Sequence, residues 1–77
     1  MHKEQIARKL IDAYRDRYPD GLVPPNDASR IVRLQASYLA TMRSRGGGPP
    51  AVKSGNRIYY PLNELAEWFA ERSVQKR

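Results

Sequence analysis

The apolar side chains of this chain fall into four stretches with helical spacing and one stretch that alternates. Residues 3–18 carry apolar side chains on one face and charges on the other, which predicts a helix that ends before Pro19. The apolar face of this helix consists of Ile6, Ala7, Leu10, Ile11, Tyr14 and Tyr18. An isolated helix of this length is marginal in water, so its apolar face must pack on the domain or on a partner.

Two short helices are expected next, joined by three residues. Proline is well tolerated at the first position of a helix, so Pro25 favours a helix over 25–32 with Ala28, Ile31 and Val32 on its buried side. Residues 33–35 form a tight connection, with Leu34 packing beneath it. A third helix is predicted over 36–44, with Leu39 and Met42 facing inward.

A hairpin and a closing helix complete the pattern. Glycines and prolines at 46–50 end the third helix, and 51–60 read as two short strands around Ser54-Gly55-Asn56. The last helix opens at 61–64 with Asn63 as its cap, and its apolar stripe consists of Leu62, Leu65, Trp68 and Phe69. We expect Trp68 to be the central core residue and the polar chain from Arg72 onward to fray.

The predicted fold class is therefore α+β and mostly helical, in three parts. Residues 1–20 form an additional N-terminal helix, 21–71 form the main domain and 72–77 form a frayed tail. Two short helices joined by a three-residue turn have the form of a helix-turn-helix, and the hairpin that follows has the position of a wing. Together they predict a winged helix-turn-helix.

Charge is distributed unevenly along the 77 residues. Lys and Arg number 14 and Asp and Glu number 8, which gives a net charge of +6. No acidic residue occurs from Ala28 to Asn63, a segment that holds Arg30, Arg33, Arg43, Arg45, Lys53 and Arg57. A surface of this kind favours a polyphosphate partner, because cations that neutralise phosphates release condensed counterions.

Composition excludes several other functions. The chain has no cysteine and one histidine, His2, so it offers no disulfide, no Cys/His metal site and no plausible nucleophile–base pair. We expect no enzyme activity, no cofactor, no metal and no small-molecule substrate. No apolar run approaches the length of a membrane span, and the charged N-terminus is unlike a signal peptide, so a cytoplasmic protein is expected.

Candidate DNA contacts follow from the polar and cationic side chains of the predicted helix-turn-helix and hairpin. Hydroxyl and guanidinium groups on the third helix can bind base edges or phosphates, while Lys and Arg on the hairpin can enter a minor groove or bind phosphates. The candidates on the third helix and its end are Ser37, Tyr38, Thr41, Arg43, Ser44 and Arg45. Those on the hairpin are Lys53, Ser54, Asn56 and Arg57, and candidate backbone contacts near the turn are Arg30, Arg33 and Gln35.

Residues 23–69 also resemble a known family, the excisionases and AlpA-like regulators, whose DNA-binding domain is related to that of MerR proteins. The matching segments are 23–32 for the first helix, 36–43 for the recognition helix, 47–53 for the loop into the wing and 56–60 for the returning strand, with Leu62, Leu65 and Trp68 in the closing helix. The turn departs from the family, which usually has Gly, a hydrophobic residue and Ser where this chain has Arg33, Leu34 and Gln35.

The resemblance implies a recombination directionality factor of bacterial or phage origin. Such a protein binds and bends attachment-site DNA, commonly as several protomers head to tail, and biases an integrase of the tyrosine recombinase type toward excision without catalysing a reaction itself. An AlpA-like transcriptional regulator that binds a promoter is the first alternative. A protein-interaction module that docks through the 3–18 helix is the second, and it accounts poorly for the acid-free segment.

Overall fold

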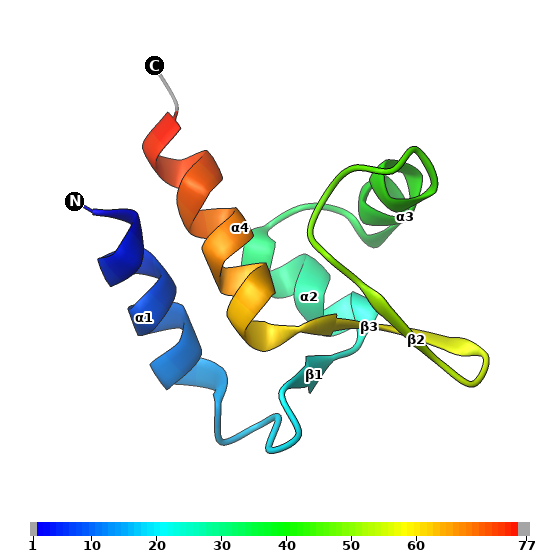
Figure 1. The fold of residues 1–77 in the computed structure, drawn as a ribbon, viewed down its shortest axis with the longest axis horizontal. Coiled ribbons are helices and arrows are strands. Elements are labelled where there is room, and N and C mark those ends of the chain that lie inside the picture. Colours follow the sequence, from blue (N-terminus) through cyan, green and yellow to red (C-terminus); the bar gives the residue numbers. More distant parts are fainter. Residues whose placement is uncertain (1, 76–77) are drawn as a thin grey trace.

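A computed structural model describes residues 2–75 of the chain, which form four α-helices and a three-stranded antiparallel sheet (Figure 1). The elements are α1 (Lys3–Tyr14), β1 (Leu22–Val23), α2 (Pro25–Val32), α3 (Ala36–Ser44), β2 (Val52–Ser54), β3 (Arg57–Pro61) and α4 (Leu62–Gln75). The fold is thus α+β and mostly helical, as the sequence predicts. Within this part of the chain, no helix has both the length and the apolar character needed to cross a bilayer.

The sheet has one strand that the sequence analysis did not predict. Its order is β1-β3-β2, so β3 lies in the middle. Leu22 pairs with Pro61 and Val23 with Tyr60, and the backbone N–H of Leu62 donates to the carbonyl of Gly21 at 2.8 Å. Because β1 holds the inner edge of the hairpin, the hairpin is anchored to the domain as part of a sheet.

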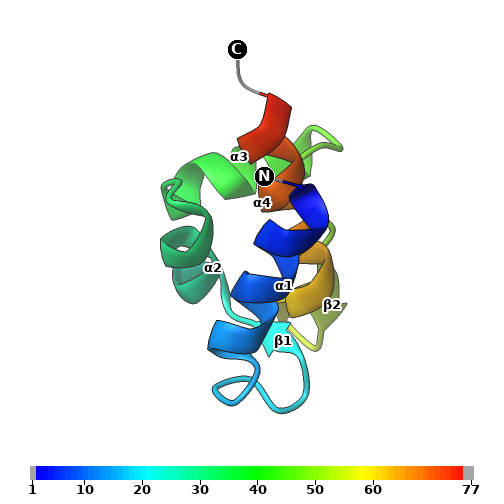
Figure 2. The ribbon, with the colours of Figure 1, turned by 90° about the vertical axis from the view of Figure 1, so that its left-hand side faces the viewer.

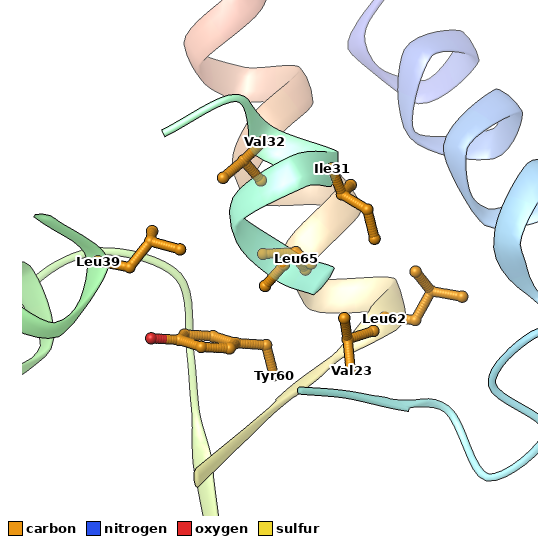
Figure 3. Close-up of a cluster of buried hydrophobic side chains, with 8 residues drawn as sticks. Val23, Ile31, Val32, Leu39, Tyr60, Leu62 and Leu65 are labelled. Carbon is orange, nitrogen blue, oxygen red and sulfur yellow. The ribbon is translucent and has the colours of Figure 1, made fainter. Parts of the chain in front are cut away.

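The main core lies between α2, α3, β3 and the first half of α4 (Figure 3). Its buried members are Val23, Ala28, Ile31, Val32, Leu39, Tyr60, Leu62 and Leu65. Tyr60 is the largest fully buried side chain, at 1% exposure. Trp68 is only half-buried at the edge of this cluster, so the expectation that it is the central core residue is wrong. Tyr60 takes that place because β3 runs through the middle of the sheet.

A second, smaller cluster attaches α1 to α4. Ala7 of α1 is buried against Ala66 and Ala70 of α4, and Ile6, Leu10 and Ile11 pack around them. Small side chains let the two helices lie side by side, on the opposite side of the molecule from α3 and the hairpin (Figures 1 and 2). Ala7 is buried and the other residues on the apolar face of α1 are half-buried, so this face is covered in part within its own chain.

Two helix boundaries differ from those expected. The first helix ends at Tyr14, and two short-range bonds, Arg17 N–H to Tyr14 O and Tyr18 N–H to Arg15 O, carry the chain into a turn before Pro19. Pro19 disfavours a helical conformation only at Tyr18, the residue before it, so it ends this turn but does not explain why the helix stops at Tyr14. Helix α4 instead runs beyond Arg72 to Gln75, so the expected fraying from Arg72 is wrong for residues 72–75, while residues 76–77 and Met1 lie outside the described part.

The start and the last described turns of α4 show why these expectations failed. The helix begins at Leu62, immediately after β3, so Asn63 is inside the helix and is not its cap. At the other end, the Ser73 hydroxyl donates to the carbonyl of Phe69 at 3.0 Å. The Arg72 guanidinium lies 4.8 Å from the centre of the Trp68 ring, a cation–π distance. These contacts favour another helical turn.

Candidate nucleic-acid interface

The acid-free segment forms one end of the molecule. It begins within α2, passes through α3 and the β2–β3 hairpin, and reaches the first turn of α4. In Figure 1, α3 and the hairpin lie together at the end opposite α1. All the candidate contact residues are exposed: Arg30, Arg33, Gln35, Ser37, Tyr38, Thr41, Arg43, Ser44, Arg45, Lys53, Ser54, Asn56 and Arg57.

The turn between α2 and α3 is built around a left-handed arginine. Arg33 has φ 61° and ψ 39°, and within residues 2–75 no other non-glycine residue has a positive φ. Its N–H and that of Leu34 both donate to the carbonyl of Ser29, while the Ser29 hydroxyl donates to the carbonyl of Leu34 at 2.6 Å. Leu34 packs against the core, so this turn fixes where α3 starts.

Helix α3 presents its polar residues on a narrow face. At about 100° per residue, Ser37, Thr41 and Ser44 fall within an arc of about 60°. Leu39, on the other side, is fully buried. The Thr41 hydroxyl donates to the carbonyl of Ser37 at 3.0 Å, and the Ser44 hydroxyl donates to that of Thr41 at 3.1 Å. Both hydroxyl protons are thus directed to the helix backbone, which leaves the oxygen lone pairs available to accept hydrogen bonds.

The flanks of this face differ. Tyr38 and Arg45 lie beside Thr41, and Tyr38 is 47% exposed, so its ring does not fold back onto the core. Arg43 lies on the opposite flank, about 40° around the helix from Leu39. Arg43 therefore faces the side of α3 that turns toward the rest of the domain, away from Arg45.

The chain leaves α3 through a glycine turn that directs it to the hairpin. Gly46 has φ 84° and its N–H donates to the carbonyl of Arg43, while the N–H of Gly47 donates to that of Met42 at 2.8 Å. This pair of bonds is the Schellman arrangement, which requires a left-handed residue that glycine adopts without strain. A Cβ at Gly48 would lie 3.0 Å from the Cβ of Met42, so the loop passes close against α3.

The hairpin turns tightly and exposes its outer strand. Ser54 pairs with Arg57, so only Gly55 and Asn56 form the loop, and Gly55 has φ 62° as the first residue of a two-residue turn. Every residue of β2 is exposed, and β2 lies at the edge of the sheet. Lys53, Ser54, Asn56 and Arg57 are thereby placed at the tip and rim of the hairpin.

A hollow of about 350 Å³ lies where α3, the hairpin and the start of α2 meet. It is lined by Pro24, Pro25, Arg43, Arg57, Ile58 and Tyr59. The two arginines are 14 positions apart in the sequence (57 − 43), and the fold brings them to one depression. Neither has an ion-pair partner among residues 2–75. The sequence identified both arginines as candidate contacts but neither the prolines nor Ile58.

Residues around the first half of α2 are less cationic than the sequence suggests. Arg30 lies 3.7 Å from Asp27, which partly offsets its charge. Asp27 also accepts a 2.7 Å hydrogen bond from the Tyr18 hydroxyl. Burial, and next this hydrogen bond, raise the pKa of the Tyr18 phenol above its ordinary value. Arg33 and Gln35 are exposed at the turn beside α3, so Arg33 adds a cation next to those of α3 and the hairpin.

The side of the molecule around α1 and α4 carries charges of both signs. A groove of about 670 Å³ runs between these helices, and its lining includes Glu4, Glu64, Glu67, Glu71 and the half-buried Trp68. Lys3 lies 3.2 Å from Glu71 across it. Helix α1 also carries Arg8 and Lys9, so cations offset the carboxylates of this side, and the net positive charge belongs to the acid-free segment.

Known proteins give no further guide to this surface. Comparisons of the chain with models of protein families, with curated proteins and with solved structures found no match. The likeness to excisionases and AlpA-like regulators thus depends only on the residues quoted for it in the sequence. The role of the acid-free segment has to be inferred from its exposed cations, its hollow and its lack of carboxylates.

Proposed function

We propose that the protein is a sequence-specific, double-stranded DNA-binding protein in which α2, α3 and the hairpin act as a winged helix-turn-helix. The observation that carries the proposal is the hollow shared by Arg43 of α3 and Arg57 of β3, on a segment without acidic residues. Two unpaired guanidinium groups at one depression can both donate hydrogen bonds to a single anion. DNA phosphates are anions that also suit the neighbouring exposed cations.

The dimensions of the elements fit a duplex. The major groove of B-DNA admits one α-helix, and α3 offers a narrow face of small hydroxyl side chains, Ser37, Thr41 and Ser44, with Tyr38 at its edge. The hairpin then lies along the neighbouring backbone and minor groove, with Asn56 at its tip. Arg45 and Lys53 bind phosphates on the two sides.

The biological role we propose is that of an excisionase, a cytoplasmic protein that bends attachment-site DNA for a tyrosine-recombinase integrase and catalyses nothing itself. The resemblance of residues 23–69 supports this role. An AlpA-like regulator would use the same surface on a promoter, and an excision assay with the integrase encoded nearby separates the two. Docking through α1 is less favoured because part of its apolar face is already packed on α4.

The primary test is a gel shift with duplex DNA from the protein's own genomic locus, with a shuffled duplex as control. We expect preferential binding to a segment of the locus. If four to six basic residues meet phosphates, the log–log salt slope is about −4 to −5 per protomer. Equal binding to both duplexes would refute sequence specificity, and a slope near zero would refute the electrostatic basis of the proposal.

Assembly on DNA has a separate test. One short helix and one hairpin cover too few base pairs to select a genomic site alone, so we propose head-to-tail binding of several protomers. Since part of the apolar face of α1 is packed on α4, we propose that the contact between protomers uses other surfaces. Titration of duplexes with one, two and three sites should show a rise in apparent affinity as neighbours are added. Independent filling of the sites would rule out cooperative assembly.

A further inference from the structure

We infer that the hollow between α3 and the hairpin binds a single sugar–phosphate unit of the DNA backbone, with Arg43 and Arg57 on the same phosphate. This inference rests on the proposed DNA binding and assigns the part of the duplex that the hollow takes. It selects among the roles that the sequence leaves open, in which Arg43 contacts a base edge or a phosphate and Arg57 contacts a minor groove or a phosphate.

The lining of the hollow matches the two halves of such a unit. Arg43 and Arg57 supply guanidinium donors, whose planar shape suits phosphate oxygens. The remaining walls come from Pro24, Pro25, Ile58 and Tyr59, which offer mostly apolar surface against which a deoxyribose can pack.

The charge around the hollow favours an anion. No acidic side chain lines it, and neither guanidinium has an ion-pair partner elsewhere in residues 2–75. Both arginines are therefore available to attract a phosphate that enters the hollow. A phosphate also accepts bonds from two directions at once, which two guanidinium groups from different elements can supply.

The location of the hollow indicates what a phosphate bound by Arg43 and Arg57 would do. It lies between the helix proposed for the major groove and the hairpin proposed for the adjacent minor groove, and a backbone strand separates two such grooves. Arg43 is on the flank of α3 away from Arg45, on the side of the buried Leu39. A phosphate held in the hollow would therefore set how α3 and the hairpin lie against the duplex, independently of base sequence.

The test compares salt slopes of binding to a random-sequence duplex for the wild type, Arg43→Ala, Arg57→Ala and the double variant. If both arginines share one phosphate, either single variant still neutralises it and its slope changes little. The double variant then loses about 0.9 from the slope. The controls are Lys53→Ala alone and Lys53→Ala combined with Arg43→Ala. Because Lys53 is outside the hollow, Lys53→Ala alone should already lose from the slope the contribution of the phosphate that Lys53 binds.

Other results would overturn the inference. Loss of about 0.9 in each single variant and about 1.8 in the double variant would place the arginines on separate phosphates. Unchanged slopes with altered base preference in Arg43→Ala would make it a base reader. If the wild type binds DNA and the variants are indistinguishable from it, only the shared phosphate contact of Arg43 and Arg57 is refuted. If the wild type binds no duplex, the proposed function is refuted as well. Thermal melts check folding, and both exposed arginines should be replaceable without loss of stability.

Discussion

The Ser29 hydroxyl and the Leu34 carbonyl are joined by a 2.6 Å hydrogen bond that closes the turn between α2 and α3. The Leu34 N–H returns a 3.1 Å bond to the Ser29 carbonyl, so the two residues are linked in both directions. Arg33, enclosed by this pair, is held at φ 61°, a conformation that costs a non-glycine residue about 1–2 kcal/mol. The serine therefore maintains a turn that glycine would adopt without strain.

We predict that Arg33→Gly stabilises the domain. Glycine removes the left-handed strain but adds entropy to the unfolded chain, so the expected net gain is about 0.5–1 kcal/mol. For a domain of this size, such a gain raises the melting temperature by about 2–8 °C. The matched control is Arg45→Gly, another exposed arginine at a helix end but with φ −93°, which should not stabilise. A melt of Arg33→Gly at or below the wild-type temperature would contradict the prediction.

The sequence predicted α2 and α3 to the residue because both have strong local end signals. Pro25 begins α2, and the glycines at 46–48 end α3. Other elements depend on contacts that no local pattern reports. Strand β1 is two residues long and exists because Val23 pairs with Tyr60. The start of α4 is fixed by the end of β3. Asn63 is therefore a residue type that often caps helices, but it lies inside the helix and not at the cap position.

The central residue of the core also could not be predicted from local sequence patterns alone. Tyr59 and Tyr60 alternate across β3, and alternation in a strand predicts one buried and one exposed ring. Tyr60 is buried, but Tyr59 is half-buried, and only the three-stranded sheet shows that Tyr60 is the central one. We predict that Tyr60→Ala costs about 3–5 kcal/mol and leaves the domain largely unfolded, since its total stability is of that order. Trp68→Ala should cost less, because Trp68 is half-buried. Thermal melts by circular dichroism compare the two, and the reverse order would show that Trp68 carries the core.

The alanine contact between α1 and α4 leads to a prediction about overpacking. Ala66 is fully buried against Ala7, which is 6% exposed. Ala66→Leu adds volume where the helices are closest, at an expected cost of about 1–3 kcal/mol. Ala13→Leu is the control, since Ala13 is exposed on α1 and its replacement should leave the melting temperature nearly unchanged. Equal effects of the two substitutions would show that α1 does not pack on α4 through its alanines.

The raised pKa of the Tyr18 phenol predicts that the stability of the domain depends on pH in the alkaline range. Its phenol has a raised pKa in the folded state, so the unfolded chain loses the proton first, at pH values near 10. The stabilisation is complete below that pH and declines as the pH rises through the folded-state pKa. Tyr18→Phe should therefore be less stable than the wild type near neutrality, with a difference that narrows above about pH 10. Tyr38→Phe, at an exposed ring, is the control, and a constant difference across this range would contradict the assignment.

The sequence predicts which segment carries the candidate interface, but not which of its side chains lie close together. The absence of acidic residues from 28 to 63 identified the segment, and its candidate cations are exposed. What the sequence could not reveal is that Arg43 turns toward Arg57, because their meeting depends on the glycine turn at 46–48 and on the pairing of β2 with β3. Nor could it show that Asp27 offsets Arg30, since that ion pair depends on side-chain geometry.

Thr41 provides a prediction for base reading by α3. Its hydroxyl proton is donated to the Ser37 carbonyl at 3.0 Å, so toward DNA the oxygen can act only as an acceptor. The major-groove donors it can bind are the amino groups of adenine and cytosine. We therefore expect selected binding sites to show A or C at one position facing Thr41, and Thr41→Ala to reduce that preference by about 0.5–1.5 kcal/mol, the value of one hydrogen bond.

The matched variants for Thr41 separate base reading from general attraction. Thr41→Ser keeps the oxygen and should keep the preference, while Lys53→Ala should weaken binding to all sequences alike. Alanine is the better helix former, so loss of selectivity in Thr41→Ala would not come from melting of α3. Selection from a randomised duplex library measures the preference at each position. If Thr41→Ala weakened every sequence equally, or changed none, α3 would not lie in the major groove with this face toward the bases.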